Sequence, residues 1–115
     1  MKLSNQSQAR GFEAQAWMAL GSIEGKTDPA RTDVAAEHIR QGISIAEECK
    51  ARAFAAQGYL FLGELFTEAG KKEDALENLK KAEAMYLEMK VTPRSHWFAR
   101  TQEALHRLEQ GRRAK

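Results

Sequence analysis

Two stripes of small and apolar side chains around residues 58–89 constrain this chain more than any other feature. The members of each stripe recur at steps of three and four residues, which places them on one face of a helix. The first stripe is Ala55, Tyr59, Leu62, Phe66 and Ala69, and the second is Ala75, Leu79, Ala82, Tyr86 and Met89. Gly70 lies between them, where a residue that tolerates a left-handed conformation can end a helix. The spacing predicts two antiparallel helices that bury their stripes against each other.

The first half of the chain contains a partial copy of this pattern. The motif Trp17-x2-Leu20-Gly21 precedes Tyr59-x2-Leu62-Gly63 by 42 residues. A further stripe precedes the second stripe above by 40 residues and consists of Ala35, Ile39, Gly42, Ala46 and Cys49. Glu24 departs from the copy because it occupies the position of Phe66. Burial of an unpaired carboxylate is costly, so we expect this end of the first helix to be exposed or its loop to fold differently.

The repeated motif resembles a known family. Tyr59-x2-Leu62-Gly63-x2-Phe66, followed by Ala75-x3-Leu79 and Ala82, is similar to the tetratricopeptide repeat, with Tyr59 for the usual Trp and Leu79 for the usual Phe. Both copies exceed the ~34-residue period of the simplest repeats. Asp28-Pro29-Ala30 and the Leu62-Gly63-Glu64-Leu65 core resemble the longer-helix repeats of bacterial signalling and regulatory proteins, including nucleotide cyclases and large ATP-dependent activators. The resemblance implies a helix-turn-helix scaffold that binds other proteins; a generic helical hairpin is the alternative interpretation.

These patterns predict one all-α domain over residues 1–115, an antiparallel helix-hairpin array of about five helices that resembles an α-solenoid. Its predicted parts are a divergent first repeat in 4–49, a second repeat in 53–90, a capping helix in 95–110 and a basic tail in 111–115. Residues 50–52 contain neither Gly nor Pro, so one continuous helix across them is an alternative. We favour a break, because the step from Cys49 to Ala55 takes the two flanking stripes out of phase.

The predicted capping helix has an apolar face of its own. Its members are Trp97, Phe98, Thr101, Ala104, Leu105 and Leu108. The ends of repeat arrays need a polar outer face to remain soluble. We therefore interpret this helix as a solvating cap on the last repeat.

Composition narrows the possible classes of function. A formal net charge of +2 gives little support to nucleic-acid binding. No apolar run approaches the ~20 residues needed to cross a membrane, and the N-terminal MKLSNQSQAR lacks the apolar core of a secretory signal. Cys49 is the single cysteine, which excludes an intrachain disulfide and favours a reducing, cytoplasmic location.

The residue types that most often carry catalysis are scattered along the chain. His38 has no His or Cys at ligand spacing, and His96 and His106 are ten residues apart. Cys49 continues an apolar stripe, which is typical of a buried structural thiol. The isolated glycines form no phosphate-binding loop. We predict no enzymatic activity, no cofactor and no metal site.

The family resemblance also implies a binding surface. In tetratricopeptide repeats the first helix of each repeat lines a concave face, where a peptide or helix of a partner protein docks. Carried over, the partner-binding positions are Gln15, Met18 and Ser22 in the first repeat and Gln57, Leu60, Glu64, Thr67 and Glu68 in the second. One subgroup clamps a C-terminal carboxylate with Lys, Arg and Asn; Met18, Ser22, Leu60 and Glu64 stand at those places, which argues against that mode. A solvated face without a ligand is the alternative.

Two other functions fit parts of the sequence. Two and a half repeats leave an apolar edge at each end, so a homodimer could form through Trp17, Met18 and the fifth helix. A regulatory module associated with nucleic acid could use Arg107, Arg112, Arg113 and Lys115. The low net charge argues against the second of these.

Overall fold

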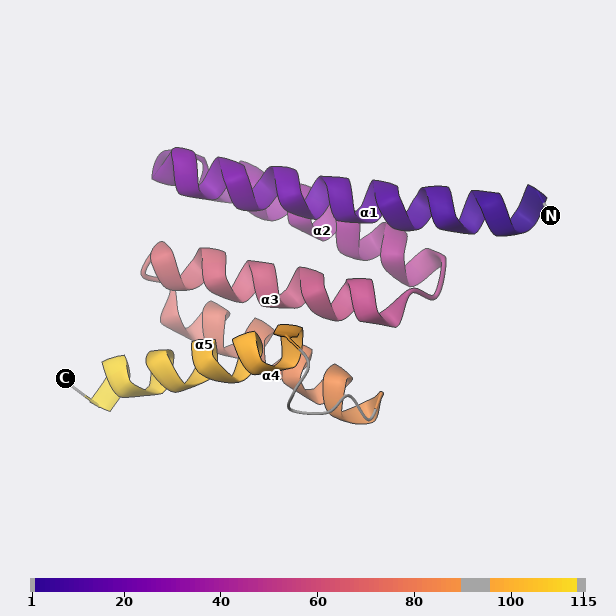
Figure 1. Ribbon diagram of the computed structural model, residues 1–115. Helices are drawn as coiled ribbons and strands as arrows, with labels where there is room; N and C mark the ends of the chain where they lie inside the picture. The colour runs from indigo at the N-terminus through magenta and orange to yellow at the C-terminus, as the bar shows by residue number, and fades with distance from the viewer. Residues whose placement is uncertain (1, 90–95, 114–115) are drawn as a thin grey trace.

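Helices make up the structure throughout the part of the chain that it describes. The computed structural model describes residues 2–89 and 96–113. Its elements are α1 (Lys2–Thr27), the short 3-10 turn η1 (Pro29–Arg31), α2 (Thr32–Glu48), α3 (Arg52–Glu68), α4 (Lys72–Glu88) and α5 (His96–Arg113) (Figure 1). No β-strand occurs within these two ranges, which confirms the predicted all-α class. The predicted boundaries at 90 and 95, and positions 114–115 of the tail, lie outside the described residues.

The helices are separated by short turns with recognisable chemistry. The Asp28 carboxylate accepts a hydrogen bond from the Ala30 amide at 3.0 Å and so caps the turn that leads into α2. Gly70 adopts a φ of 82° between α3 and α4, and the Lys71 amide donates to the Phe66 carbonyl. Lys50 adopts a φ of 60° between α2 and α3, and the Ala51 amide donates to the Ala46 carbonyl in the same pattern. The favoured break at 50–52 is therefore confirmed, with a lysine in the role that glycine plays in the second turn.

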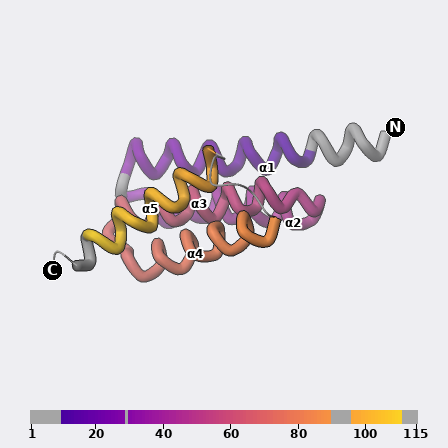
Figure 2. Tube along the Cα trace, turned by 60° about the horizontal axis from the view of Figure 1, so that its bottom comes forward, coloured from indigo at the N-terminus to yellow at the C-terminus, as the bar shows by residue number. Residues whose placement is uncertain are grey.

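Neighbouring helices run in opposite directions and pack side by side. α1 lies along α2, α3 lies along α4, and α2 packs against α3 (Figures 1 and 2). α5 lies against α4 and also contacts α3. In Figure 1, α1, α3 and α5 occupy the near side and α2 and α4 lie behind them. None of the described helices combines the length and the apolar character that crossing a membrane requires.

The buried faces of α2, α3 and α4 largely follow the predicted stripes. Ten predicted positions are less than 9% exposed and belong to one core: Ala35, Ile39, Ala46, Ala55, Leu62, Phe66, Ala75, Leu79, Ala82 and Tyr86. Small residues let the helices approach closely, as a Cβ at Gly63 would overlap Leu79. Ala69 is an exception: it lies beyond the end of α3 and is exposed. The inner face of α5 also matches the prediction, with Phe98, Thr101, Leu105 and Leu108 buried.

The first repeat differs from the second around Leu20 and Glu24, at the end of α1. Leu20 is 45% exposed, whereas the equivalent Leu62 is 2% exposed. Of the two expectations for this end of α1, exposure was wrong, because the Glu24 side chain is only 16% exposed within the helix. The loop does fold differently, because the 3-10 turn η1 occupies the place of the Gly70 turn of the second repeat. His38 and Arg31 pair with the Glu24 carboxylate. Two polar partners thus allow a carboxylate to occupy a covered position.

Candidate binding groove between α1, α3 and α5

Three adjoining hollows, lined by residues of α1, α3 and α5, share Glu64 of α3 and form one surface, which we call the groove. The two larger hollows have volumes of about 390 and 230 Å³. α1 contributes Ser22 and Lys26 to the lining, and α3 contributes Phe61, Glu64, Leu65, Thr67 and Glu68. α5 contributes His96, Ala99, Arg100, Glu103, Ala104 and Arg107. Alternate helices of the chain therefore build one continuous surface.

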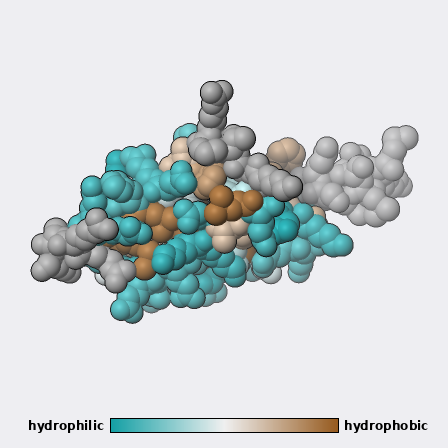
Figure 3. Space-filling view, turned by 90° about the horizontal axis from the view of Figure 1, so that it is seen from below, coloured by the Kyte–Doolittle hydropathy of each residue, from teal (hydrophilic) through white to brown (hydrophobic). Residues whose placement is uncertain are grey.

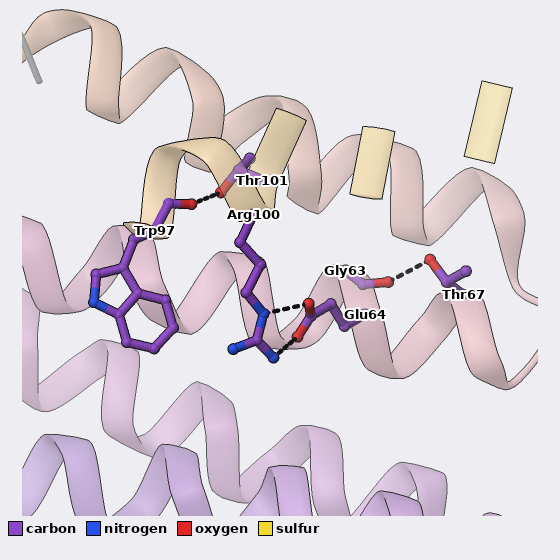
Figure 4. A network of polar contacts seen from close by, with 6 residues as sticks. All are labelled: Gly63, Glu64, Thr67, Trp97, Arg100 and Thr101. Atoms are coloured by element: carbon purple, nitrogen blue, oxygen red, sulfur yellow. Dashed lines mark hydrogen bonds and ion pairs between the residues drawn. The ribbon is translucent and has the colours of Figure 1, made fainter. Parts of the chain in front are cut away.

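An ion pair between α3 and α5 lies at the centre of the groove. Arg100 donates from Nε to Glu64 Oε2 at 2.7 Å and from Nη2 to Glu64 Oε1 at 2.6 Å (Figure 4). This two-point geometry is the strong form of an arginine–carboxylate contact. Hydrogen bonding with Glu64 raises the pKa of Arg100 above its ordinary value, although partial burial acts in the opposite direction. The pair joins the two helices while each side chain stays about one quarter to one third exposed.

Aromatic rings surround the guanidinium of this pair. Arg100 Cζ lies 5.6 Å from the centroid of the Phe61 ring and 5.5 Å from that of Trp97. The two rings meet edge to face with centroids 5.7 Å apart. Rings at this distance attract a cation through their electron-rich faces. Phe61 and Trp97 therefore hold the charged end of Arg100 in place, and Phe61 also gives the groove an apolar wall.

Hydroxyl groups beside the pair are used within their own helices. Thr67 donates to the Gly63 carbonyl at 2.7 Å, and Thr101 donates to the Trp97 carbonyl at 2.8 Å (Figure 4). Both contacts span four residues along a helix. Because both hydroxyl protons are bonded within their own helices, these threonines stabilise the shape of the surface and are not free to donate a hydrogen bond to a ligand.

The charges along the groove have mixed sign. Lys26 lies at the α1 side and Glu68 at the α3 side, while Arg107 pairs with Glu103 along α5 at 2.7 Å. Arg100 and Glu64 neutralise each other. A ligand that fits this surface therefore carries both charges or few charges, rather than a dense block of one sign.

Half of the residues predicted to bind a partner lie in the groove. These are Ser22, Glu64, Thr67 and Glu68. Met18 and Leu60, predicted as its apolar contacts, are 0% exposed, and Gln57 is 7% exposed. Gln15 is partly exposed but does not line the groove.

The burial of Met18 and Leu60 corrects the prediction and has a physical cause. A Cβ at Gly42 or at Gly58 would lie within about 3 Å of Met18, which therefore fills space between α2 and α3. Leu60 lies in α3, which contacts α1, α2, α4 and α5. A helix with four neighbours buries more than one stripe.

The α5 side of the groove was missed by sequence reasoning. Arg100 lies 36 residues after Glu64, so no local spacing links the two side chains. The available signal was Trp97-x2-Arg100, which places an aromatic ring and a cation one helical turn apart. That signal does not specify which helix the face will meet.

Comparison of the chain with protein-family models, with curated proteins and with solved structures gave no significant match. The chemistry of the groove must therefore be interpreted from its own residues. Among the residues with described side chains, no group of three or more His, Cys, Asp or Glu is arranged to hold a metal ion. What the groove offers is an apolar wall, an ordered ion pair and separated charges of both signs.

Proposed function

We propose that this chain is a tetratricopeptide-like α-solenoid that acts as a non-catalytic scaffold and binds a peptide or helix of a partner protein in the groove. The observation that carries the proposal is that the alternate helices α1, α3 and α5 line one surface, centred on Glu64 and Arg100. The internal repeat supports the same architecture. By resemblance we further propose a cytoplasmic role in signalling, either alone or as a repeat segment of a larger protein.

The shape of the groove supports a peptide over a small metabolite. Its hollows extend from Ser22 on α1 to Arg107 on α5 and are open along their length. A small ligand is usually held in an enclosed pocket that covers most of its surface. An extended segment can instead contact Lys26, the Arg100–Glu64 pair and the Phe61 wall in succession.

Another hollow, of about 510 Å³, lies between the ends of α2 and α3 and the side of α4. Two of its three cations have partners, since Arg52 pairs with Glu88 and Lys81 lies over the Tyr59 ring at 4.5 Å. The groove remains the better candidate because the first helices of both repeats, α1 and α3, line it.

The proposal can be tested with peptides selected from a random displayed library against the full chain. We expect Lys26→Glu to weaken the best selected peptide about tenfold in a fluorescence anisotropy titration, because it reverses a charge in the groove lining. Lys80→Glu is the matched control, since Lys80 is exposed on α4 and does not line the groove. Unchanged binding to Lys26→Glu, or an equal loss with Lys80→Glu, would exclude the groove as the binding surface.

A further inference from the structure

Helix α1 is apolar on two opposite sides. Its buried side consists of Gly11, Ala14, Met18, Gly21 and Gly25. The opposite side, which we call the outer stripe, consists of Phe12, Ala16, Ala19, Leu20 and Ile23, all exposed. Phe12, Leu20 and Ile23 expose 69%, 45% and 61% of their surface and are three of the five exposed large hydrophobic residues in the described part of the chain. The outer stripe contains no charged residue.

The equivalent side of α3 shows what such a stripe does in this fold. A shift of 42 residues aligns the outer stripe with Phe54, Gly58, Phe61, Leu62 and Leu65. A Cβ at Gly11 would lie 2.9 Å from the Phe54 ring, and one at Gly25 would overlap Leu65. Gly58 faces Ile43 of α2 in the same way. Phe54, Gly58 and Leu65 therefore belong to the surface of α3 that packs against α1 and α2. α1 presents the same kind of surface, which none of the other described helices covers.

Among the residues with described side chains, the other end of the helix order shows no matching apolar stripe. α5 covers the far side of α3 and α4, where Phe98 packs on Tyr86 with ring centroids 5.9 Å apart. The outward residues of α5 are mainly polar, including Gln102, Glu103, His106 and Glu109. Figure 3, which views the molecule from the side of α4 and α5, shows hydrophilic residues over most of the coloured surface, with smaller hydrophobic patches between them. Because a head-to-tail contact needs two different complementary faces and the described outward side of α5 is mainly polar, a symmetric contact of the outer stripe with itself is the better match between two copies of this chain.

We propose that two copies of this chain form a dimer through the outer stripe, with α1 antiparallel to α1 of the second copy. A two-fold axis between positions 17 and 18 sets Phe12 opposite Ile23 and Ala16 opposite Ala19. Alanines at the centre let the two helices approach closely, while the large side chains fill the space at both ends. The stripe is thus complementary to itself, which is the requirement for an isologous contact.

This dimer replaces the one that the sequence suggested. Met18 is fully buried within one chain, and Trp17 packs on His38 with ring centroids 5.3 Å apart. The outward side of α5 is mainly polar. These residues therefore do not form the apolar edge that the prediction assigned to them, and the outer stripe does.

The small size of the outer stripe sets the expected affinity. A stable interface buries about 800 Å² on each partner, and the stripe covers only about three turns of one helix. We expect a dimer in rapid exchange, with a dissociation constant on the order of tens of micromolar.

Sedimentation velocity of the full chain between about 1 and about 500 µM tests the dimer, because this range brackets the expected constant. We expect Ile23→Glu to raise the dissociation constant at least about tenfold while the circular dichroism spectrum stays unchanged, since Ile23 is exposed in the single chain. Leu87→Glu is the matched control, because Leu87 is 58% exposed on α4. A monomer at every concentration, or a dimer that Ile23→Glu does not weaken more than Leu87→Glu does, would overturn the proposal.

Disulfide trapping tests the orientation. In a Cys49→Ser background, the Ala16→Cys and Ala19→Cys proteins should cross-link with each other faster than either does with itself. Faster self-cross-linking of each protein would indicate parallel helices and overturn the antiparallel register. Phe12→Glu, at a position of the outer stripe that does not line the groove, should weaken the dimer and leave peptide binding in the groove unaltered, so failure of the dimer and failure of the groove are distinguishable.

Discussion

α1 and α5 are the first and last helices of the described chain, and their outward sides differ in composition. α5 turns polar residues outward and buries Phe98, Leu105 and Leu108. α1 buries mainly glycine and alanine and leaves Phe12, Leu20 and Ile23 exposed. Regularly spaced apolar residues on the inner face therefore do not by themselves identify a capping helix. The composition of the outer face decides whether an end of the array is closed or can accept a further helix.

The two helices are also attached by different means. α1 approaches α2 so closely that a Cβ at Gly21 would overlap the Ala35 carbonyl oxygen. α5 is attached through large side chains, with Phe98 on Tyr86 and Arg100 on Glu64. Enlarging a side chain should therefore damage the α1 contact, and truncating one should damage the α5 contact.

The largest expected effect comes from truncating the α5 anchor. Phe98→Ala should lower the free energy of unfolding by about 3–5 kcal/mol, because it leaves a cavity where the ring is 2% exposed. Phe12→Ala is the matched control, and with 69% exposure it should cost less than about 0.5 kcal/mol. Urea denaturation followed by circular dichroism measures both values. Similar losses for the two variants would remove the distinction between the inner face of α5 and the outer face of α1.

An intermediate effect is expected from Tyr86, which joins α4 to α5. Its hydroxyl is buried without a hydrogen-bond partner in the described residues, and burial raises its pKa from 10.0 to about 12. The unfolded chain loses this proton near pH 10 while the folded chain keeps it, so stability falls between pH 10 and 12. This loss should be about 2 kcal/mol larger in the wild type than in Tyr86→Phe.

Stability measured from pH 8 to 12 by urea denaturation tests this difference. At pH 8, Tyr86→Phe should be as stable as the wild type or slightly more so, because it removes an unpaired buried hydroxyl. If Tyr86→Phe is instead destabilised by more than about 1 kcal/mol at pH 8, the Tyr86 hydroxyl has a hydrogen-bond partner in the folded protein and the α4–α5 contact includes a polar interaction.

The smallest effect is expected at the close contact between α1 and α2. Gly21→Ala gains about 1 kcal/mol of helix propensity but must push against the Ala35 carbonyl, and overpacking costs about 1–3 kcal/mol. We expect a net loss of about 1 kcal/mol by thermal unfolding. Gly25→Ala should cost less, because the atom it meets is the flexible end of Leu65. A more stable Gly21→Ala protein would show that α1 and α2 can separate without loss.

Much of the fold could be predicted from the local spacing of apolar residues, whereas only part of the groove could. The steps of three and four residues placed Leu62, Phe66, Leu79 and Tyr86 on buried faces, because a helix has the same geometry wherever it occurs. Glu64 and Glu68 were assigned to the groove and do line it. The same reasoning placed Leu60 there as well, although it is fully buried.

The sequence by itself determined which segments are helical and which face of most helices is apolar, since both depend on residues a few positions apart. The tertiary structure alone decided how many neighbours each helix has. The packing of the helices explains why Leu60 is buried, why Leu20 is exposed and why His38 and Arg31 cover Glu24. The same packing brings Arg100 to Glu64, although the two residues are 36 positions apart in the sequence. The physical reason is that burial and ion pairing depend on distances between helices, which the spacing within one helix does not contain.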